Sequence, residues 1–317
     1  MKIVSCFSRL SEIEPLAAAG ADELYCAVAD LPSFGYGVLK GGGLKAAARK
    51  AHALGKKLSL AVNSMRITYA AGQMKTFAAR LERAAADGVD SFIVASPSVF
   101  ELFSRLKRPL PGPVHLSSVQ PCLNSLTARY FIRLGISRLI LPSQVAPLEC
   151  AEIFRECRAA RVETEVFDYR FFGCVYVNGR CNLHDPVFHT FREGAGQPAL
   201  CRCAAGKGPS VKPVGIAPGS GPEALRLTRR LYARMTCSGP PRLNNAAAFF
   251  DFFTMGTNYL KYGTRADTPE VKVRKVKELR AMLDLAEGLS RDLPRSGARA
   301  AFIDRMTRWR GLEGGNP

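Results

Sequence analysis

Five cysteines gather in one stretch of the sequence and carry its clearest chemical signal. Cys174 and Cys181 are separated by six residues, and Cys201, Cys203 and Cys237 follow. An iron-sulfur cluster needs four thiolate ligands, which dispersed spacings supply once the fold brings them together. Four thiolates also suit zinc. The stretch therefore predicts a metal centre, with a 4Fe-4S cluster as the first expectation and zinc as the alternative.

Four of the other five cysteines are expected to pack rather than to bind metal. Cys6, Cys122, Cys150 and Cys157 fall within apolar strands or on helix faces, where free cysteine behaves as a small hydrophobic residue. Cys26 ends a predicted strand on the side of the expected cluster, so it is kept as an alternative ligand.

The sequence pattern predicts that short apolar strands alternate with Ala-rich helices, which is typical of βα units around a parallel sheet. Each of several helices ends near a glycine, as a helix C-cap prefers. The predicted strands are 2–6, 23–28, 57–63, 91–95, 114–117, 138–141, 163–167 and 258–262. Helices are predicted over 11–19, 43–54, 74–87 and 269–287. Eight such strands favour a TIM-like (β/α)8 parallel barrel, because closure leaves no sheet edge exposed.

The alternation of strands and helices is interrupted after the seventh strand by a Cys-, Gly- and Pro-rich insertion over residues 171–245. Barrel chemistry occurs on the loops that follow the strands, so this insertion is expected on the catalytic face. We predict one barrel over residues 1–287 that includes the insertion, and a basic C-terminal tail over 288–317 with one terminal helix.

Neutral polar groups at the predicted strand ends are suited to holding a small anion together with arginines. The candidates are Asn63, Ser117, Gln120 and Asn124, with Arg180, Arg202 and Arg265 as the cations. For Asn124, which opens a predicted helix, an ordinary N-cap is the alternative.

Composition and charge describe a folded, basic protein. Of the 317 residues 47% are hydrophobic, and the net charge is +18. Such an excess of Lys and Arg favours contact with polyanions such as RNA, although an Arg-rich tail alone would also raise it. No apolar run approaches the roughly 20 residues of a membrane helix. The first ten residues, MKIVSCFSRL, lack the basic, apolar and small-residue regions of a signal peptide. We therefore expect a cytoplasmic protein without membrane insertion.

Several blocks of sequence together resemble the peptidase U32 (collagenase-like) family. They are SEIEPLAAAGADELYCAV, DGVDSFIVASPSVFELF, the run from VHLSSVQPCLN to LILPSQV, EVFDYRFFGCVYVNGRC and LKYGTR. The fourth block is similar to the family signature, in which a cysteine is followed seven residues later by the cysteine of Gly-Arg-Cys. The resemblance thereby implies Cys174 and Cys181 as ligands, with Cys201 and Cys237 favoured beside them and Cys203 as the substitute.

The family resemblance implies either peptidase activity or oxygen-independent hydroxylation with a 4Fe-4S cluster. The implied hydroxylation targets are tRNA, ribosomal RNA and the ubiquinone ring, with prephenate as oxygen donor. A second U32-family subunit is an implied partner. The sequence contains no nucleophile elbow and no H-E-x-x-H motif, so it favours the redox interpretation over the peptidase. A basic RNA-binding scaffold without catalysis is the third hypothesis.

Two further residues match the family pattern. Glu165 matches the signature glutamate and could act as a general base, or it could instead pair with Arg170 or Arg180. His115 matches the family's His-Leu-Ser and could shuttle a proton, or it could be a hydrogen-bonded core residue. The chain departs from the pattern at Ser143-Gln144 and Asp168-Tyr169, which indicates a divergent branch.

Overall fold

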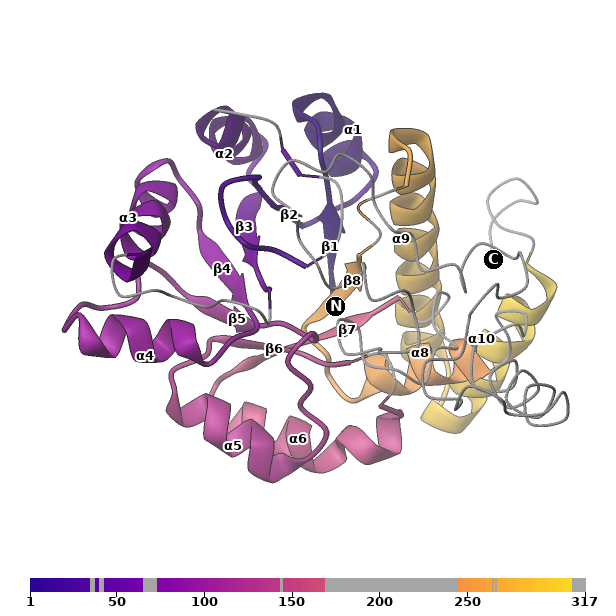
Figure 1. The fold of residues 1–317 in the computed structure, drawn as a ribbon. Helices are drawn as coiled ribbons and strands as arrows, with labels where there is room; N and C mark the ends of the chain where they lie inside the picture. The colour runs from indigo at the N-terminus through magenta and orange to yellow at the C-terminus, as the bar shows by residue number, and fades with distance from the viewer. Residues whose placement is uncertain are drawn as a thin grey trace, which may run out of the picture.

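Eight parallel strands form a closed barrel (Figure 1). The computed structural model describes residues 1–34, 38–39, 43–64, 73–142, 145–168, 244–263, 265 and 267–309. The strands are β1 (Lys2–Cys6), β2 (Glu23–Cys26), β3 (Lys57–Val62), β4 (Ser91–Val94), β5 (Val114–Leu116), β6 (Arg138–Ile140), β7 (Glu163–Phe167) and β8 (Tyr259–Tyr262). Each strand pairs in parallel with the next, and β8 pairs with β1 to close the sheet. The predicted TIM-like fold is confirmed.

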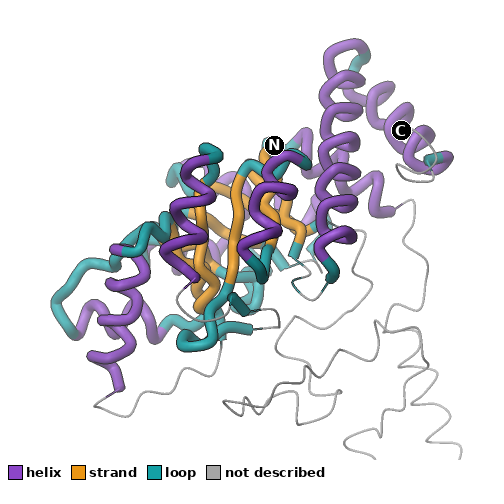
Figure 2. Tube along the Cα trace, turned by 90° about the horizontal axis from the view of Figure 1, so that it is seen from above, coloured by secondary structure: helices purple, strands orange, loops and turns teal. Residues whose placement is uncertain are grey.

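Helices follow the strands and cover the outside of the sheet (Figure 2). They are η1 (Leu10–Glu12), α1 (Ile13–Ala18), α2 (Gly43–Ala53), α3 (Gln73–Ala86), α4 (Ser98–Arg105), α5 (Ser125–Arg133), α6 (Pro147–Ala159), α8 (Asn244–Thr254), α9 (Pro269–Asp292) and α10 (Arg295–Arg308). Apolar side chains of the strands and helices form one hydrophobic core.

Each described turn that leads from a helix into the next strand contains a residue with a positive φ angle. Five of these residues are glycines, as the C-cap preference predicts: Gly20, Gly55, Gly88, Gly135 and Gly256. The other two turns place a cation there, Lys107 at φ 52° and Arg161 at φ 57°. An L-residue in this conformation is strained by its own Cβ atom.

The C-terminal helices differ from the predicted layout. The predicted boundary between residues 287 and 288 falls inside α9, which continues to Asp292. α10 then packs against α8 and α9, and the rings of Phe249 and Phe302 stack with their centroids 5.4 Å apart. The terminal helix therefore belongs to the folded body, while residues 310–317 lie outside the described part of the chain.

Candidate active site at the carboxyl end of the barrel

Polar residues that follow three different strands meet at the carboxyl end of the barrel. Asn63 follows β3 and donates from Nδ2 to Ser117 Oγ, after β5, over 3.0 Å. The Phe34 N–H donates to Asn63 Oδ1 over 2.9 Å. Arg265, three residues beyond β8, donates from Nη2 to the carbonyl oxygen of Phe34. The Phe34 peptide thus joins Arg265 to Asn63, and three of the predicted anion-binding residues share one network.

The Arg265 guanidinium is buried and only partly satisfied. Its side chain is 7% exposed, and Nη1 has no hydrogen-bond partner among the described residues. A buried donor that lacks an acceptor is costly, and a cationic one more so than a neutral one. The site is therefore suited to an acceptor with negative charge, such as a carboxylate.

The two remaining described candidates of this group hold the loop after β5. The Gln120 N–H donates to the carbonyl oxygen of Ser117 over 3.0 Å. Asn124 is the N-cap of α5, and its Oδ1 accepts from the Thr127 N–H over 2.9 Å. The N-cap alternative for Asn124 is confirmed. Arg180 and Arg202 lie outside the described residues.

Glu165 lies inside the barrel between two cations. Its Oε1 accepts from Lys261 Nζ over 2.7 Å, and its Oε2 accepts from Arg138 Nη1 over 2.9 Å. Burial alone would raise the pKa of the Glu165 carboxyl, but the two cations overcome burial and hold that pKa below its ordinary value. The carboxylate is paired, as the alternative interpretation expected, although with Arg138 and Lys261. A catalytic role for Glu165 remains a prediction.

The same arginine extends the ion pairs across the barrel interior. Arg138 on β6 donates from Nη2 to Glu23 Oε2 on β2 over 2.9 Å. Because β2 and β6 are not neighbouring strands, this bond must cross the space that the sheet encloses. The Arg138 guanidinium also lies 3.5 Å from the centroid of the Tyr259 ring. We call Glu23, Arg138, Glu165 and Lys261 the interior ion network.

Sequence reasoning missed Glu23, Arg138 and Lys261. The available signal was a charged residue within each short, otherwise apolar strand. Successive residues of a strand face opposite sides of the sheet, and these charges occupy inward positions. Charged side chains are almost never buried unless they are paired. Inward charges on different strands therefore predict that these residues are partners of one another.

His115 on β5 is a buried histidine beside this network. Burial, followed by the charges of Arg138 and Lys261, lowers the pKa of His115 well below 6.5, so the imidazole is neutral at pH 7. Its Nδ1 has no hydrogen-bond partner among the described residues. The proposed proton shuttle therefore remains a prediction.

All the described cysteines are free and buried, which confirms the packing prediction for four of them. Burial raises the pKa of Cys6 to about 11 and that of Cys26 to about 12. The pKa values of Cys122, Cys150 and Cys157 are each raised to about 12 by burial as well. Thiols with such pKa values are poor nucleophiles at neutral pH.

The predicted metal centre falls where the structure gives no description. Within the described ranges, no group of three or more His, Cys, Asp or Glu side chains could hold a metal ion. The predicted ligands Cys174, Cys181, Cys201, Cys203 and Cys237 all lie outside these ranges.

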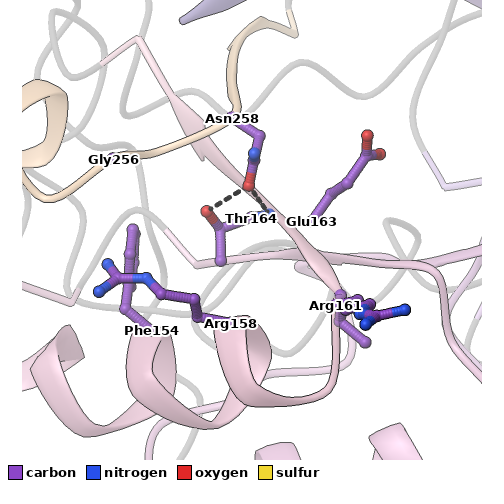
Figure 3. A pocket seen from close by; sticks show the side chains of 8 residues that line it. Phe154, Arg158, Arg161, Glu163, Thr164, Gly256 and Asn258 are labelled. Carbon is purple, nitrogen blue, oxygen red and sulfur yellow. Dashed lines mark hydrogen bonds between the residues drawn. The ribbon is translucent and has the colours of Figure 1, made fainter.

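A cavity of about 220 Å³ lies at the opposite end of the barrel, where β7 begins (Figure 3). On its wall, Asn258 Oδ1 accepts from the Thr164 N–H over 2.8 Å and from Thr164 Oγ1 over 3.2 Å. The Arg158 and Arg161 side chains extend to opposite sides of this cavity (Figure 3).

Comparison with known proteins identifies the family. Residues 8–198, more than half of the chain, match the family model described as peptidase family U32. The chain belongs to the peptidase U32 family. The resemblance predicted from the sequence blocks is thereby confirmed.

Curated relatives within the U32 family include several called tRNA hydroxylation protein P. The protein of Helicobacter pylori strain J99 is 31% identical over 131 residues, which are 41% of this chain and 29% of the relative. The protein of Escherichia coli K12 is 30% identical over 135 residues, 42% of this chain and 28% of the relative. The matched part thus spans less than a third of the length of these relatives.

Solved structures that match this chain include the U32 peptidase Mk0906. The match has 15% sequence identity and a TM-score of 0.41, and it covers 53% of this chain and 68% of that one. A putative fructose-1,6-biphosphate aldolase from Coccidioides immitis has 12% identity and a TM-score of 0.43, over 97% of this chain and 87% of that one. In the described part of this U32 chain, no helix is long and apolar enough to cross a membrane.

Proposed function

We propose that this U32 chain takes part in the oxygen-independent hydroxylation of a tRNA base. The names of the matched relatives support hydroxylation of tRNA, and the basic charge of +18 supports contact with RNA. A 4Fe-4S cluster on Cys174, Cys181, Cys201 and Cys237, with Cys203 as the substitute ligand, is part of the proposal.

The observation that carries this proposal is the partly satisfied Arg265 guanidinium beside Asn63 and Ser117. A small organic anion would supply the acceptor that Arg265 Nη1 lacks. The Asn63–Ser117 pair, 3.0 Å apart, would orient that anion from the opposite strands. We assign this site to the oxygen donor, for which the family resemblance suggests prephenate.

The cluster would supply one-electron transfer, and this chain's described residues would bind and orient the small molecules. An aromatic or quinone-type small molecule is the alternative substrate to the tRNA base, and the Arg265 site would hold the oxygen donor in either case. Peptidase activity has less support, because the described thiols are buried with raised pKa values. An RNA scaffold without catalysis would leave the Arg265 site without a role.

The proposal is tested by anaerobic purification with iron and sulfide analysis, joined to mass spectrometry of tRNA nucleosides. The chain, or variants of it, is expressed in a host that lacks its own gene of this kind. We expect brown protein with about four iron and four sulfide per chain, since four thiolates hold one such cluster. Cys174→Ala and Cys181→Ala should lose the colour, whereas Cys157→Ala, a packed thiol, should keep it.

Arg265→Gln separates the anion site from the cluster. We expect this variant to keep its iron but to lose hydroxylated tRNA and to bind prephenate at least about tenfold more weakly, since a hydrogen bond to a charged group contributes roughly 1.5–3 kcal/mol. Arg105→Gln, which removes an exposed arginine, is the matched control. Colourless protein without iron would refute the cluster, and unchanged prephenate affinity would refute the anion site.

A further inference from the structure

A tyrosine inside the barrel reaches the turn that carries Arg265. Tyr25, on β2, donates from its hydroxyl to the carbonyl oxygen of Gly263 over 3.1 Å. Gly263 is the first residue after β8, and Arg265 follows two residues later. In the closed sheet β1 lies between β2 and β8 (Figure 1). The Tyr25 side chain therefore crosses one strand to hold a segment 238 residues away in the sequence.

The same carbonyl oxygen also fixes the backbone of Arg265. It accepts the Arg265 N–H over 3.1 Å in addition to the Tyr25 hydroxyl. A carbonyl oxygen has two lone pairs, so both bonds can form at once. Because the two donors share this acceptor, a shift of the Gly263 carbonyl would move the base of the Arg265 side chain.

Close packing restricts the turn further. A Cβ atom added at Gly263 would lie 2.8 Å from Cε1 of Phe167, a distance that real Cβ atoms essentially never show. It would also lie 3.6 Å from the Tyr25 hydroxyl oxygen. The backbone at Gly263 is therefore packed directly against the Phe167 ring, and any larger residue would push that ring aside.

The Tyr25 ring is held in turn by the interior ion network. Lys261 Nζ lies 4.0 Å from the centroid of the Tyr25 ring while it donates to Glu165. A cation is attracted to an aromatic face at this distance. Tyr25 is 5% exposed, and burial raises its pKa well above 10. Its hydroxyl therefore stays protonated and remains a donor at neutral pH.

We propose that Tyr25 is a positioning residue for Arg265, and that it holds the guanidinium ready to bind the carboxylate of a small organic anion. The assignment rests on the proposed anion site at Arg265. A long side chain loses rotamer freedom when it binds a ligand, and a fixed backbone at its base reduces that loss. Without the Tyr25 bond the turn is released on one side, and Arg265 would present its guanidinium from several positions instead of one.

Chemical labelling of Arg265 tests its position without any ligand. Phenylglyoxal modifies accessible guanidiniums, and peptide mass spectrometry compares its rate at Arg265 with that at exposed Arg105 in the same anaerobically purified full chain. Tyr25→Phe keeps the aromatic ring over Lys261 and removes only the hydroxyl. We expect this variant to raise the ratio of rates at least about threefold, since one hydrogen bond contributes a factor of this order. Tyr259→Phe removes the hydroxyl of another tyrosine that is 5% exposed, and as the matched control it should leave the ratio unchanged.

Prephenate binding, measured by isothermal titration calorimetry, tests the consequence for the site. We expect Tyr25→Phe to weaken prephenate binding about threefold to tenfold, the range for one hydrogen bond. The same substitution should not alter the residual affinity of Arg265→Gln, because Tyr25 acts only through the arginine. Circular dichroism confirms that each variant is folded.

The two measurements separate this proposal from the proposed function. A Tyr25→Phe variant that labels at the native rate, or that binds prephenate as tightly as the native chain, would overturn the positioning role. Equal weakening in the native and Arg265→Gln backgrounds would also overturn it, because the hydroxyl would then have a ligand contact of its own. A native chain that binds no prephenate would refute the proposed donor site, while the labelling rates would still decide the role of Tyr25.

Discussion

Glu165 is held ionised inside the barrel by Lys261 and Arg138. Removing one partner of a buried ion network leaves the others without compensation, which typically costs about 3–5 kcal/mol. We therefore expect Glu165→Gln to lower the free energy of unfolding by that amount in urea denaturation. Glu101→Gln breaks an exposed pair with Arg105 and should change it by less than about 1 kcal/mol.

The pH dependence of the same group has a defined sign. The pKa of Glu165 is lower in the folded chain than its ordinary 4.5, so its contribution to stability is complete above that value. It is lost as the pH falls below 4.5 through the folded-state pKa. The native chain should lose stability over this acidic range more steeply than Glu165→Gln does. Equal slopes for the two would contradict the paired carboxylate.

At the scale of elements, two of the turns between helices and strands carry a residue other than glycine at the position of positive φ. Arg161 occupies, at φ 57°, the position that glycine fills in five other turns. We expect Arg161→Gly to raise the free energy of unfolding by roughly 0.5–1 kcal/mol, because glycine adopts a positive φ without steric cost. Thermal denaturation measures this as a higher Tm.

Gly135→Ala is the reverse change in the turn between α5 and β6. Its φ is +89°, and a Cβ added there would meet nothing within 4 Å. Only backbone strain can therefore oppose the substitution, and Tm should fall. If both substitutions shift Tm in the same direction, backbone strain does not govern these turns.

The elements were largely predictable from the sequence, because each strand is a short apolar run and most turns carry a glycine. β1 and β7 have the predicted bounds. The end of α9 was not predictable from Glu287, since Gly288 lies inside the helix and Pro294 follows its actual end. Packing against α10 stabilises the extra turn, and a local pattern does not contain that contact.

The site was predictable only in part. Asn63, Ser117 and Arg265 could be placed at strand ends, and the closed sheet brings them together. The bond between Arg138 and Glu23 spans 115 residues of sequence, so only the three-dimensional register of the barrel reveals it. The Phe34 peptide, which joins Arg265 to Asn63 through its backbone, has no side-chain signal at all.

For the whole molecule, the net charge of +18 predicts how the proposed binding of tRNA would respond to salt. The logarithm of the affinity should fall linearly with the logarithm of salt concentration, with a slope of about −0.7 to −0.9 per phosphate contacted. Filter binding between 50 and 200 mM salt, about the range over which such effects are large, would measure the slope. A slope near zero would exclude phosphate contacts.

The exposed cations of α10 permit a test of the C-terminal contribution. Arg295 and Arg305 are exposed and make no ion pair with the described residues. If α10 contacts RNA, replacing both by Gln should reduce the slope by about 1.4 to 1.8, the value for two phosphates. An unchanged slope would place the RNA contacts elsewhere on the chain.

The interior ion network also constrains when the chain can fold during synthesis. Glu23 is made early, whereas Lys261 leaves the ribosome only after nearly all the barrel has been translated. Until then the growing polypeptide would have to bury Glu165 with one of its two cations missing. Ribosome-bound intermediates that stop short of β8 should therefore stay open and sensitive to protease, and the last strand should complete the structure in one cooperative step.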